Sequence, residues 1–175
     1  MQRRPELYEQ ILRLRAIRDY SQQPLEESDL AAILEAGRWT GTSKNRQDWA
    51  VVVVRDAGQR DLLVGCGDFT EPIRRAPVSL VLVQEGKQYE FDIGRVAQNM
   101  MLAAAALGVG SCPVTLHRSA QARQVLGVPE GKTTRYAIAL GYPGEKARPA
   151  QLGGRKPVTS FIHDERYRQE SDEVD

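Results

Sequence analysis

Hydrophobic and polar residues alternate along this chain in two different rhythms. Apolar positions three or four apart predict helices, whereas short β-branched or continuous apolar runs predict buried strands. We predict a short first helix after Pro5 and further helices at Leu25–Trp39, Gln59–Val64, Glu90–Leu107 and Arg118–Leu126. Strands or extended segments are predicted at Ala50–Val54, Val78–Val83, Ser111–Leu116 and Tyr136–Leu140. Because helices and strands mix without strict βαβ order, we expect an α+β fold in which helices flank a sheet.

The strongest helical pattern is that of Glu90–Leu107. Its apolar residues form a wide face, and its C-terminal end is apolar nearly all round, which predicts a central, buried helix. Gly108 and Gly110 would end this helix. The chain has 175 residues, a length that suits one domain with a sizeable core.

Residues 144–175 form a C-terminal segment of different composition. Gly144–Arg155 is rich in Pro, Gly and charged residues, and few apolar residues follow it. A segment of this kind cannot bury itself. We therefore expect it to become ordered on another surface, for which a partner subunit is the obvious candidate.

The charges of the chain nearly cancel, with 24 Lys and Arg against 23 Asp and Glu and a net charge of +1. This balance gives no support to nucleic acid or an anionic membrane as a partner. No run reaches the ~18 apolar residues that a membrane span needs, and no signal peptide is evident. Cys66 and Cys112 form no paired motif, and we expect two reduced thiols in a cytoplasmic protein.

Several motifs of enzyme chemistry fail on inspection. Gly108-Val109-Gly110 follows a helix and lacks the third glycine of a dinucleotide site, and Gly41–Lys44 has the wrong order for a phosphate-binding loop. His117 and His163 are too far apart to suggest a zinc site, and His117 is more often a surface residue than a base. The chain lacks the usual side chains for acyl transfer or metal hydrolysis, so if it is an enzyme, a cofactor would carry the chemistry.

Three segments are informative when they are considered together. Arg15 and Arg18, three apart at the end of the first helix, could present guanidinium groups to an anion, although a solvated basic helix end is the alternative. Thr42–Trp49 carries hydroxyl and amide groups that suit the edge of a heteroaromatic ring; the alternative is a turn with Trp49 in the core. Gly108–Leu116 has small residues that let backbone approach a flat ligand, or it is simply a helix stop followed by a strand.

The order of these segments resembles the nitroreductase family of FMN enzymes. Arg-Ala-Ile-Arg-x-Tyr is followed by Ser-Lys-Asn-x-Gln-x-Trp before a valine strand, then by an alanine-rich helix that ends in Leu-Gly-Val-Gly-Ser-Cys-Pro, and then by Ala-Leu-Gly-Tyr-Pro and Gly-Arg-Lys-Pro. The resemblance runs from about Arg13 to His163. No single motif is specific, but the ordered set is fairly specific.

The resemblance implies a three-layer α+β fold with a central, mostly antiparallel sheet. It also implies an intertwined homodimer that binds FMN between its subunits, with residues 144–175 packed on the partner. The implied cofactor-binding residues are Arg15, Ala16, Arg18, Thr42, Ser43, Asn45, Gln47, Pro113, Val114, Thr115, Leu116 and Arg155, with Lys156 beside the last. Among them, Arg18 would lie near the pyrimidine edge of the flavin, Arg155 would complete the phosphate site, and the Thr115 N–H could donate to flavin N5.

This chain departs from the family pattern at several of these positions. Leu14 and Ala16 stand where an arginine and a serine are common, which thins out the phosphate contacts, and Gly41 and Asp48 stand where prolines are common. Many members also supply a polar flavin contact from the segment before the second strand. Asp68 and Thr70 lie in that segment, but the sequence assigns the contact to neither.

The implied activity is reduction of small acceptors, aromatic ones foremost, such as nitroaromatics, quinones or enones, with NADH or NADPH as the electron donor. The flavin would carry the electrons in a ping-pong hydride mechanism, so no side chain need act as a catalytic acid or base. The alternatives are a flavin carrier or sensor without turnover, a flavin-dependent dehydrogenase with another substrate, and a dimeric interaction protein that has lost its cofactor.

Overall fold

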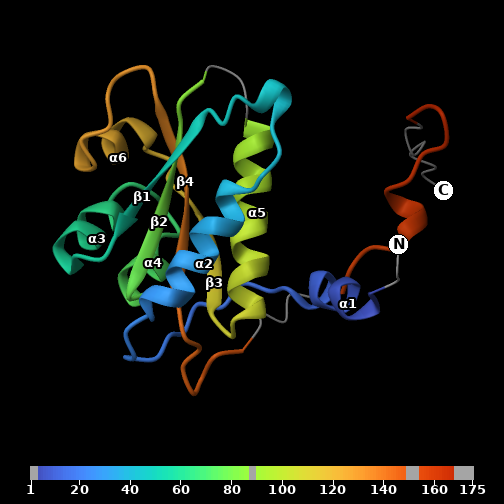
Figure 1. The fold of residues 1–175 in the computed structure, drawn as a ribbon, viewed down its shortest axis with the longest axis horizontal. Coiled ribbons are helices and arrows are strands. Elements are labelled where there is room, and N and C mark those ends of the chain that lie inside the picture. The colour runs from blue at the N-terminus through green and yellow to red at the C-terminus, as the bar shows by residue number, and fades with distance from the viewer. Residues whose placement is uncertain (1–3, 87–89, 149–153, 168–175) are drawn as a thin grey trace, which may run out of the picture.

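The computed structural model describes residues 4–86, 90–148 and 154–167, and its centre is a four-stranded sheet (Figure 1). The strands are β1 (Trp49–Val54), β2 (Val78–Gln84), β3 (Gly110–Thr115) and β4 (Thr133–Gly141), in the order β1-β2-β4-β3. Each neighbouring pair is antiparallel. The predicted α+β fold with an antiparallel sheet is therefore confirmed, and β3 lies at one edge of that sheet.

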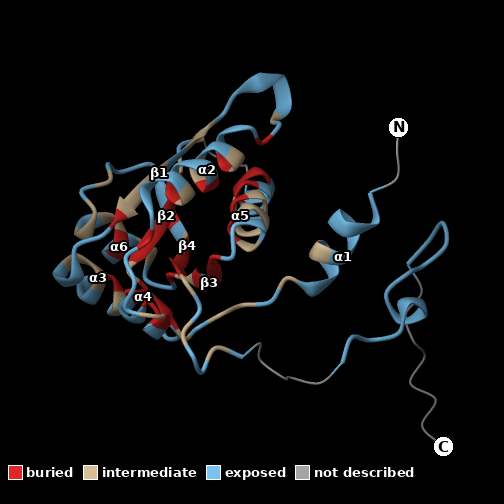
Figure 2. Ribbon diagram, turned by 60° about the horizontal axis from the view of Figure 1, so that its bottom comes forward, coloured by how far each residue is buried: buried red, intermediate tan, exposed pale blue. Residues whose placement is uncertain are grey.

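Helices cover both faces of the sheet and bury a separate apolar cluster against each face. On one face lie α2 (Glu27–Arg38) and α5 (Glu90–Ala106), and on the other lie α3 (Ala57–Val64), α4 (Glu71–Arg75) and α6 (Ser119–Val125). Side chains of β4 alternate between the two clusters, because successive residues of a strand point to opposite faces. Ala137 and Ala139 enter one cluster, and Ile138 and Leu140 enter the other. Figure 2 shows the buried residues concentrated between these layers.

Two elements differ from those predicted. The short helix α4 was not expected, because five residues are too few to show a helical period. Strand β4 begins three positions earlier than predicted, at Thr133, because tertiary contacts override the polar sequence there. Thr134 is completely buried, and its hydroxyl donates to the Ser119 carbonyl oxygen at 3.1 Å.

Helix α5 was predicted to be central and buried, and in the single chain it is buried on one face only. Ile93, Val96 and Met100 pack into the core. In contrast, Leu102 and Ala105 are only half-buried, and Leu107, just beyond the helix, is exposed. The half-buried Leu102 and Ala105 and the exposed Leu107 therefore form an apolar surface that this chain leaves partly open.

The two ends of the chain stand away from the body (Figure 1). Helix α1 (Pro5–Arg13) has no buried residue, and its large apolar side chains Leu7, Tyr8, Ile11 and Leu12 are exposed. The C-terminal segment 154–167, which includes a short 3₁₀ turn at Val158–Ser160, also exposes Val158, Phe161, Ile162 and Tyr167. Residues 149–153 and 168–175 of the predicted partner-binding segment lie outside the described residues. Within the described part, no helix combines the length and apolar character required to cross a bilayer.

Candidate functional site

The open edge of β3 directs backbone groups away from the sheet. The Leu116 N–H donates to the Arg135 carbonyl of the adjoining strand region at 2.7 Å, whereas the Ser111 carbonyl accepts from the Ile17 N–H on the outer side at 2.9 Å. Inward and outward direction alternates along an antiparallel strand. The N–H and C=O of Thr115 therefore point outward, as does the carbonyl of Pro113, which has no N–H.

Two hollows meet at this edge of β3. The smaller, of about 200 Å³, is lined by Arg18, Phe69, Pro72, Cys112, Pro113, Val114, Thr115 and His117. The larger, of about 530 Å³, lies between β3 and the first half of α5. Its lining is mostly apolar and includes Leu82, Ile93, Ala97, Met101 and Tyr136. Pro113, Val114 and Thr115 line both hollows, so this stretch of strand is their common wall.

Arg18 brings a positive charge to the smaller hollow, beside the Cys112 thiol. Burial raises the pKa of Cys112, and the neighbouring Arg18 guanidinium partly offsets that increase. The backbone around Arg18 is held in place by Tyr20, whose hydroxyl donates to the Ile17 carbonyl at 2.7 Å and lies 3.3 Å from the Ala139 carbonyl. Burial also raises the pKa of Tyr20, so this phenol stays neutral and serves as an anchor.

The structure corrects the predicted geometry of the two arginines. Helix α1 ends at Arg13, and the chain from Ile17 to Tyr20 runs extended because it bonds to Ser111 and bridges to Pro143. Arg15 and Arg18 consequently do not share a helix face and lie in different hollows. The Arg15 guanidinium donates to the carbonyls of Leu12 and Leu14 at 2.8 and 2.7 Å.

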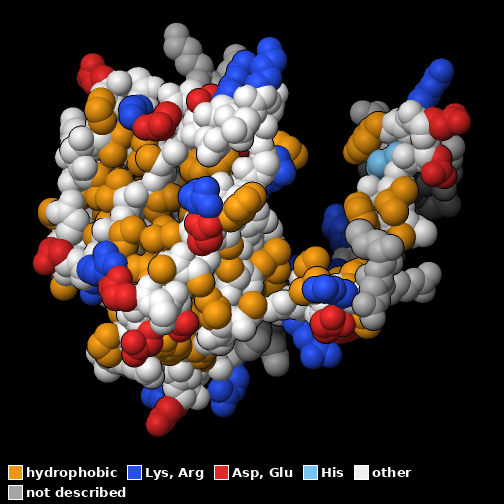
Figure 3. Space-filling model, viewed as in Figure 1, with side chains coloured by type: hydrophobic (Ala, Val, Ile, Leu, Met, Phe, Trp, Pro, Cys, Tyr) orange, Lys and Arg blue, Asp and Glu red, His pale blue; other side chains and the backbone are white. Residues whose placement is uncertain are grey.

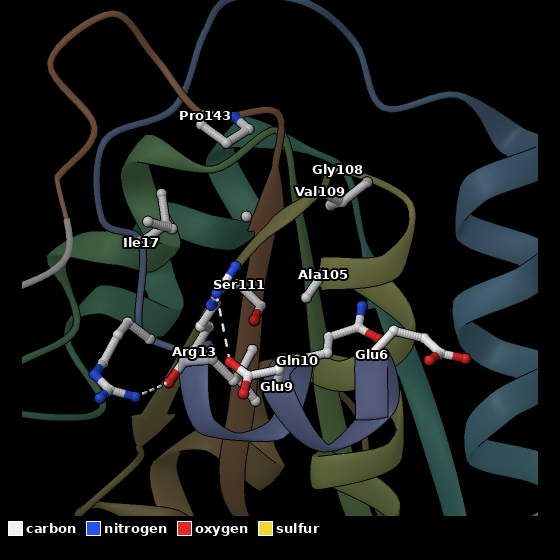
Figure 4. Close-up of a pocket in the computed structure, with 13 residues that line it drawn as sticks. Glu6, Glu9, Gln10, Arg13, Ile17, Ala105, Gly108, Val109, Ser111 and Pro143 are labelled. Carbon is white, nitrogen blue, oxygen red and sulfur yellow. Dashed lines mark hydrogen bonds and ion pairs between the residues drawn. The ribbon is translucent and has the colours of Figure 1, made fainter. Parts of the chain in front are cut away.

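Arg15 lines a third hollow, of about 640 Å³, which separates α1 from the body. Figure 4 shows Glu6, Glu9, Gln10 and Arg13 of α1 on one side of this space, and Ala105, Val109 and Ser111 on the other. Arg13 forms an ion pair with Glu9 at 3.4 Å. Ala16, the other predicted residue of this segment, is half-buried against the core.

The predicted polar loop Thr42–Gln47 is held by a defined contact but lines none of the three hollows. The Thr42 hydroxyl donates to the buried Asp92 carboxylate at 2.8 Å, which fixes the loop at the start of α5. Ser43, Asn45 and Gln47 are exposed. Lys44, Asn45 and Gln47 have φ values of 54°, 52° and 55°, and such left-handed residues are uncommon without a structural or functional reason.

This loop and the Arg15 hollow lie near opposite ends of α5. Asp92 holds the loop, and Ala105 lines the hollow, thirteen positions further along the helix. At 1.5 Å per residue these two positions are roughly 20 Å apart. Within one chain, the structure thus brings Arg18 together with Pro113, Val114 and Thr115, but it leaves the Thr42–Gln47 loop apart from Arg15.

Two further predicted residues lie away from the hollows. Arg155 and Lys156 are exposed on the C-terminal segment. The Leu116 side chain is fully buried in the core, and its N–H is already bound to Arg135, so the structure does not support a ligand contact through this side chain.

No role was predicted for His117, Phe69 or Pro72, which the fold places in the smaller hollow. Phe69 lies in the loop of residues 65–70, between α3 and α4, and Pro72 lies in the first turn of α4. This loop packs against β3. A Cβ atom on Gly67 would lie 2.6 Å from the Thr115 carbonyl oxygen, so glycine permits this approach. No spacing rule connects positions so far apart in sequence; the small residues around Cys66 were the one available signal.

The two mid-chain candidates have other partners. The Thr70 hydroxyl is buried and donates to the Val64 carbonyl at 2.7 Å. Asp68 accepts from Arg118 Nη1 at 2.8 Å, and this hydrogen bond lowers the pKa of its carboxyl. Among the described residues, no group of three or more His, Cys, Asp or Glu side chains could hold a metal ion.

The sequence was compared with protein families and with individual proteins, and it matches one family and several of its relatives. A sequence model described as the nitroreductase family matches residues 11–90 and 70–142. The chain is 25% identical over 181 residues to the NADPH-flavin oxidoreductase of Vibrio harveyi, and this match covers 92% of this chain and 74% of that protein. It is 27% identical over 179 residues to the NADH dehydrogenase of Thermus thermophilus, covering 79% of this chain and 87% of the relative.

Solved structures share the fold over nearly the whole chain. The NADPH:FMN oxidoreductase of Vibrio harveyi, solved with NAD⁺, superposes with a TM-score of 0.83 at 24% identity, covering 93% of this chain and 78% of that one. A Desulfovibrio desulfuricans protein solved in complex with FMN gives a TM-score of 0.81 at 25% identity, with coverages of 95% and 100%.

Proposed function

The chain belongs to the nitroreductase family, and on that premise we propose that it is an FMN-dependent oxidoreductase that uses NADH or NADPH to reduce small aromatic acceptors. The observation that carries this proposal is the outer edge of β3, where a cation, an outward backbone N–H and two hollows meet. The relatives support the cofactor, since one is named an NADPH-flavin oxidoreductase and another was solved with FMN.

The residues at the β3 edge fit the ring of a flavin. The exposed Pro113 and the backbone of Val114 and Thr115 offer a flat wall without bulky side chains. The outward Thr115 N–H is a donor for a ring nitrogen, and Arg18 supplies a positive charge that favours the reduced, anionic ring. Arg15 and Arg155 would hold the phosphate, because guanidinium groups pair strongly with phosphate oxygens.

We further infer that two chains complete each site. The Thr42–Gln47 loop lies roughly 20 Å from the Arg15 hollow along α5, so a second copy would have to supply it if it contacts the same flavin. The exposed apolar side chains of α1 and the open apolar surface of α5 are suited to burial against that copy. The C-terminal segment, with exposed Phe161 and Ile162, would pack on the partner in the same way.

Bound FMN would supply the redox chemistry, taking a hydride from the nicotinamide and giving electrons to the acceptor in turn. The chain would hold the ring, keep its reactive face open and stabilise its charge, and no side chain needs to act as a general acid or base. The larger hollow, with its apolar lining and Tyr136, suits a flat aromatic acceptor. A cytoplasmic location, where NADH and NADPH are present, remains part of this proposal.

Anaerobic reduction tests the proposal. The protein is purified, saturated with FMN and freed of excess cofactor, and then titrated with NADH or NADPH while the flavin absorbance is followed. We expect bleaching by at least one nucleotide and recovery of the yellow colour when a nitroaromatic or quinone is added. A yellow protein that neither nucleotide reduces would instead be a carrier or sensor, and a protein that stays colourless in excess FMN would refute flavin binding.

A further inference from the structure

The smaller hollow, which Arg18 lines, is also lined by an imidazole, that of His117. The Asp68 backbone N–H donates to His117 Nδ1 at 3.3 Å. A ring nitrogen that accepts a hydrogen bond is unprotonated, so the neutral imidazole carries its proton on Nε2. Among the described residues Nε2 has no hydrogen-bond partner, and the side chain is 43% exposed while lining the hollow.

The backbone that orients His117 is held in place by several hydrogen bonds from the next residue, Arg118. Arg118 donates to the carbonyls of Gly65 and Gly67 at 2.8 and 2.7 Å and to the Asp68 carboxylate at 2.8 Å. The Arg118 N–H also donates to the Cys66 carbonyl at 2.9 Å. This one residue thus ties the loop of residues 65–70 to the end of β3, and the donor that orients His117 is fixed with it.

The loop fixed in this way lies directly against the outer edge of β3. Gly67 approaches the Thr115 carbonyl so closely that a methyl group there would meet it at 2.6 Å. His117 comes two residues after Thr115, and both line the same hollow as Arg18. The hollow is therefore lined by Thr115, whose backbone N–H points outward from the sheet, by the Arg18 cation and by His117, whose Nε2–H is a donor.

We propose that His117 donates a hydrogen bond from Nε2 to a carbonyl oxygen at the pyrimidine edge of the bound flavin, alongside Arg18. This inference rests on the proposed function and extends it. His117 would supply the polar contact that Asp68 and Thr70 do not, since both of those side chains are committed to Arg118 and Val64. A donor at this edge stabilises the electron-rich, reduced ring more than the oxidised ring, so it raises the reduction potential.

Two substitutions separate this role from a purely structural one. His117→Asn keeps an oxygen that can accept the Asp68 N–H but has no group long enough to replace Nε2. His117→Gln places an amide N–H₂ near the position of Nε2. Gln124→Leu on α6 is the matched control, because Gln124 is an exposed polar residue that lines none of the three hollows.

The measurements are FMN affinity by quenching of flavin fluorescence, the midpoint potential of the bound flavin, and the infrared carbonyl bands of the oxidised flavin. We expect His117→Asn to bind FMN roughly three- to tenfold more weakly, as suits loss of one neutral hydrogen bond. Its midpoint potential should be more negative, and one flavin carbonyl band should move to higher frequency. His117→Gln should restore much of each property, and Gln124→Leu should match the parent.

The possible results separate failure of the proposed His117 role from failure of the proposed function. If His117→Asn binds FMN with the parent's affinity, potential and carbonyl bands, the role of His117 is refuted while the flavoenzyme stands. If affinity falls but the potential and the carbonyl bands stay unchanged, His117 only supports the loop, and the proposed hydrogen bond is again refuted. If the parent itself binds no FMN, the proposed function fails first.

Discussion

Thr115 lies at the centre of the candidate site, where its backbone N–H, its carbonyl and the neighbouring side chains all contribute. Its N–H faces outward from the sheet edge by the alternation of β3, and its carbonyl receives the close approach of Gly67. Arg18 and His117 lie around it in one hollow. Small geometric changes at this position should therefore be felt both in stability and in ligand binding.

Arg18→Ala and Arg155→Ala should each weaken FMN binding, because each removes a charged donor from the proposed site. A charge-assisted hydrogen bond contributes about 1.5–3 kcal/mol, which corresponds to roughly tenfold or more in affinity. Fluorescence titration measures the effect. Arg123→Ala, on α6 and outside the three hollows, is the control and should bind like the parent. Parental affinity in both variants would show that the residues are wrongly assigned.

Gly67→Ala should destabilise the fold. The new methyl group would lie 2.5 Å from Thr70 Cγ2 and 2.6 Å from the Thr115 carbonyl oxygen, and the second of these is backbone of the sheet. Overpacking of this kind costs about 1–3 kcal/mol in free energy of unfolding, which urea denaturation at a fixed protein concentration would measure. Gly65→Ala is the control: its Cβ would meet nothing closer than 3.4 Å, and its φ is −65°. Equal stabilities of the two variants would contradict this packing.

At the scale of elements, α1 carries apolar side chains that its own chain does not cover. Leu7 and Ile11 are 51% and 54% exposed, and four positions separate them, so they share one face of the helix. Leu7→Ser combined with Ile11→Ser should weaken self-association while leaving the body folded. Each substitution occurs twice in a homodimer, so if about 1 kcal/mol is lost at each of the four positions, the dissociation constant should rise roughly a thousandfold.

Size-exclusion chromatography with light scattering over a dilution series measures this dissociation constant. Leu62→Ser on α3 is the comparison, since Leu62 is similarly exposed at 57% but lies on the other side of the sheet. It should leave association unchanged. An unchanged dissociation constant in the α1 variant would remove α1 from the interface.

Elements with strong periodic patterns were predicted well from the sequence. The valine run of β1, the apolar run of β2 and the long period of α5 each lie within a residue or two of the predicted bounds. These patterns show which side chains of an element face the core, and each pattern can be recognised within a short stretch of sequence. The predicted geometry of the Arg15–Arg18 pair was wrong because the conformation there is set by the hydrogen bond from the Ile17 N–H to the Ser111 carbonyl and by the bridge between Tyr20 and Pro143, far along the chain. The role of His117 was hidden for the same reason, since Asp68 orients it across a distance in sequence.

At the scale of the whole molecule, the body contains two apolar clusters, one on each face of the sheet. Around this body the chain places three large unburied features, namely α1, the outer face of α5 and the C-terminal segment (Figures 1 and 3). Figure 3 shows hydrophobic side chains spread over α1 and over the C-terminal segment. This open apolar surface supports our proposal that two chains associate.

The central claim is that flavin binding and pairing of chains are one event. Sedimentation velocity detected simultaneously in the protein and flavin bands tests it most directly, using FMN-saturated protein across a range of concentrations. We predict that flavin absorbance sediments with a species of twice the 19.5 kDa chain mass and is lost as that species dissociates. Flavin that sediments with a single chain, or a dimer that carries no flavin in excess FMN, would contradict the account.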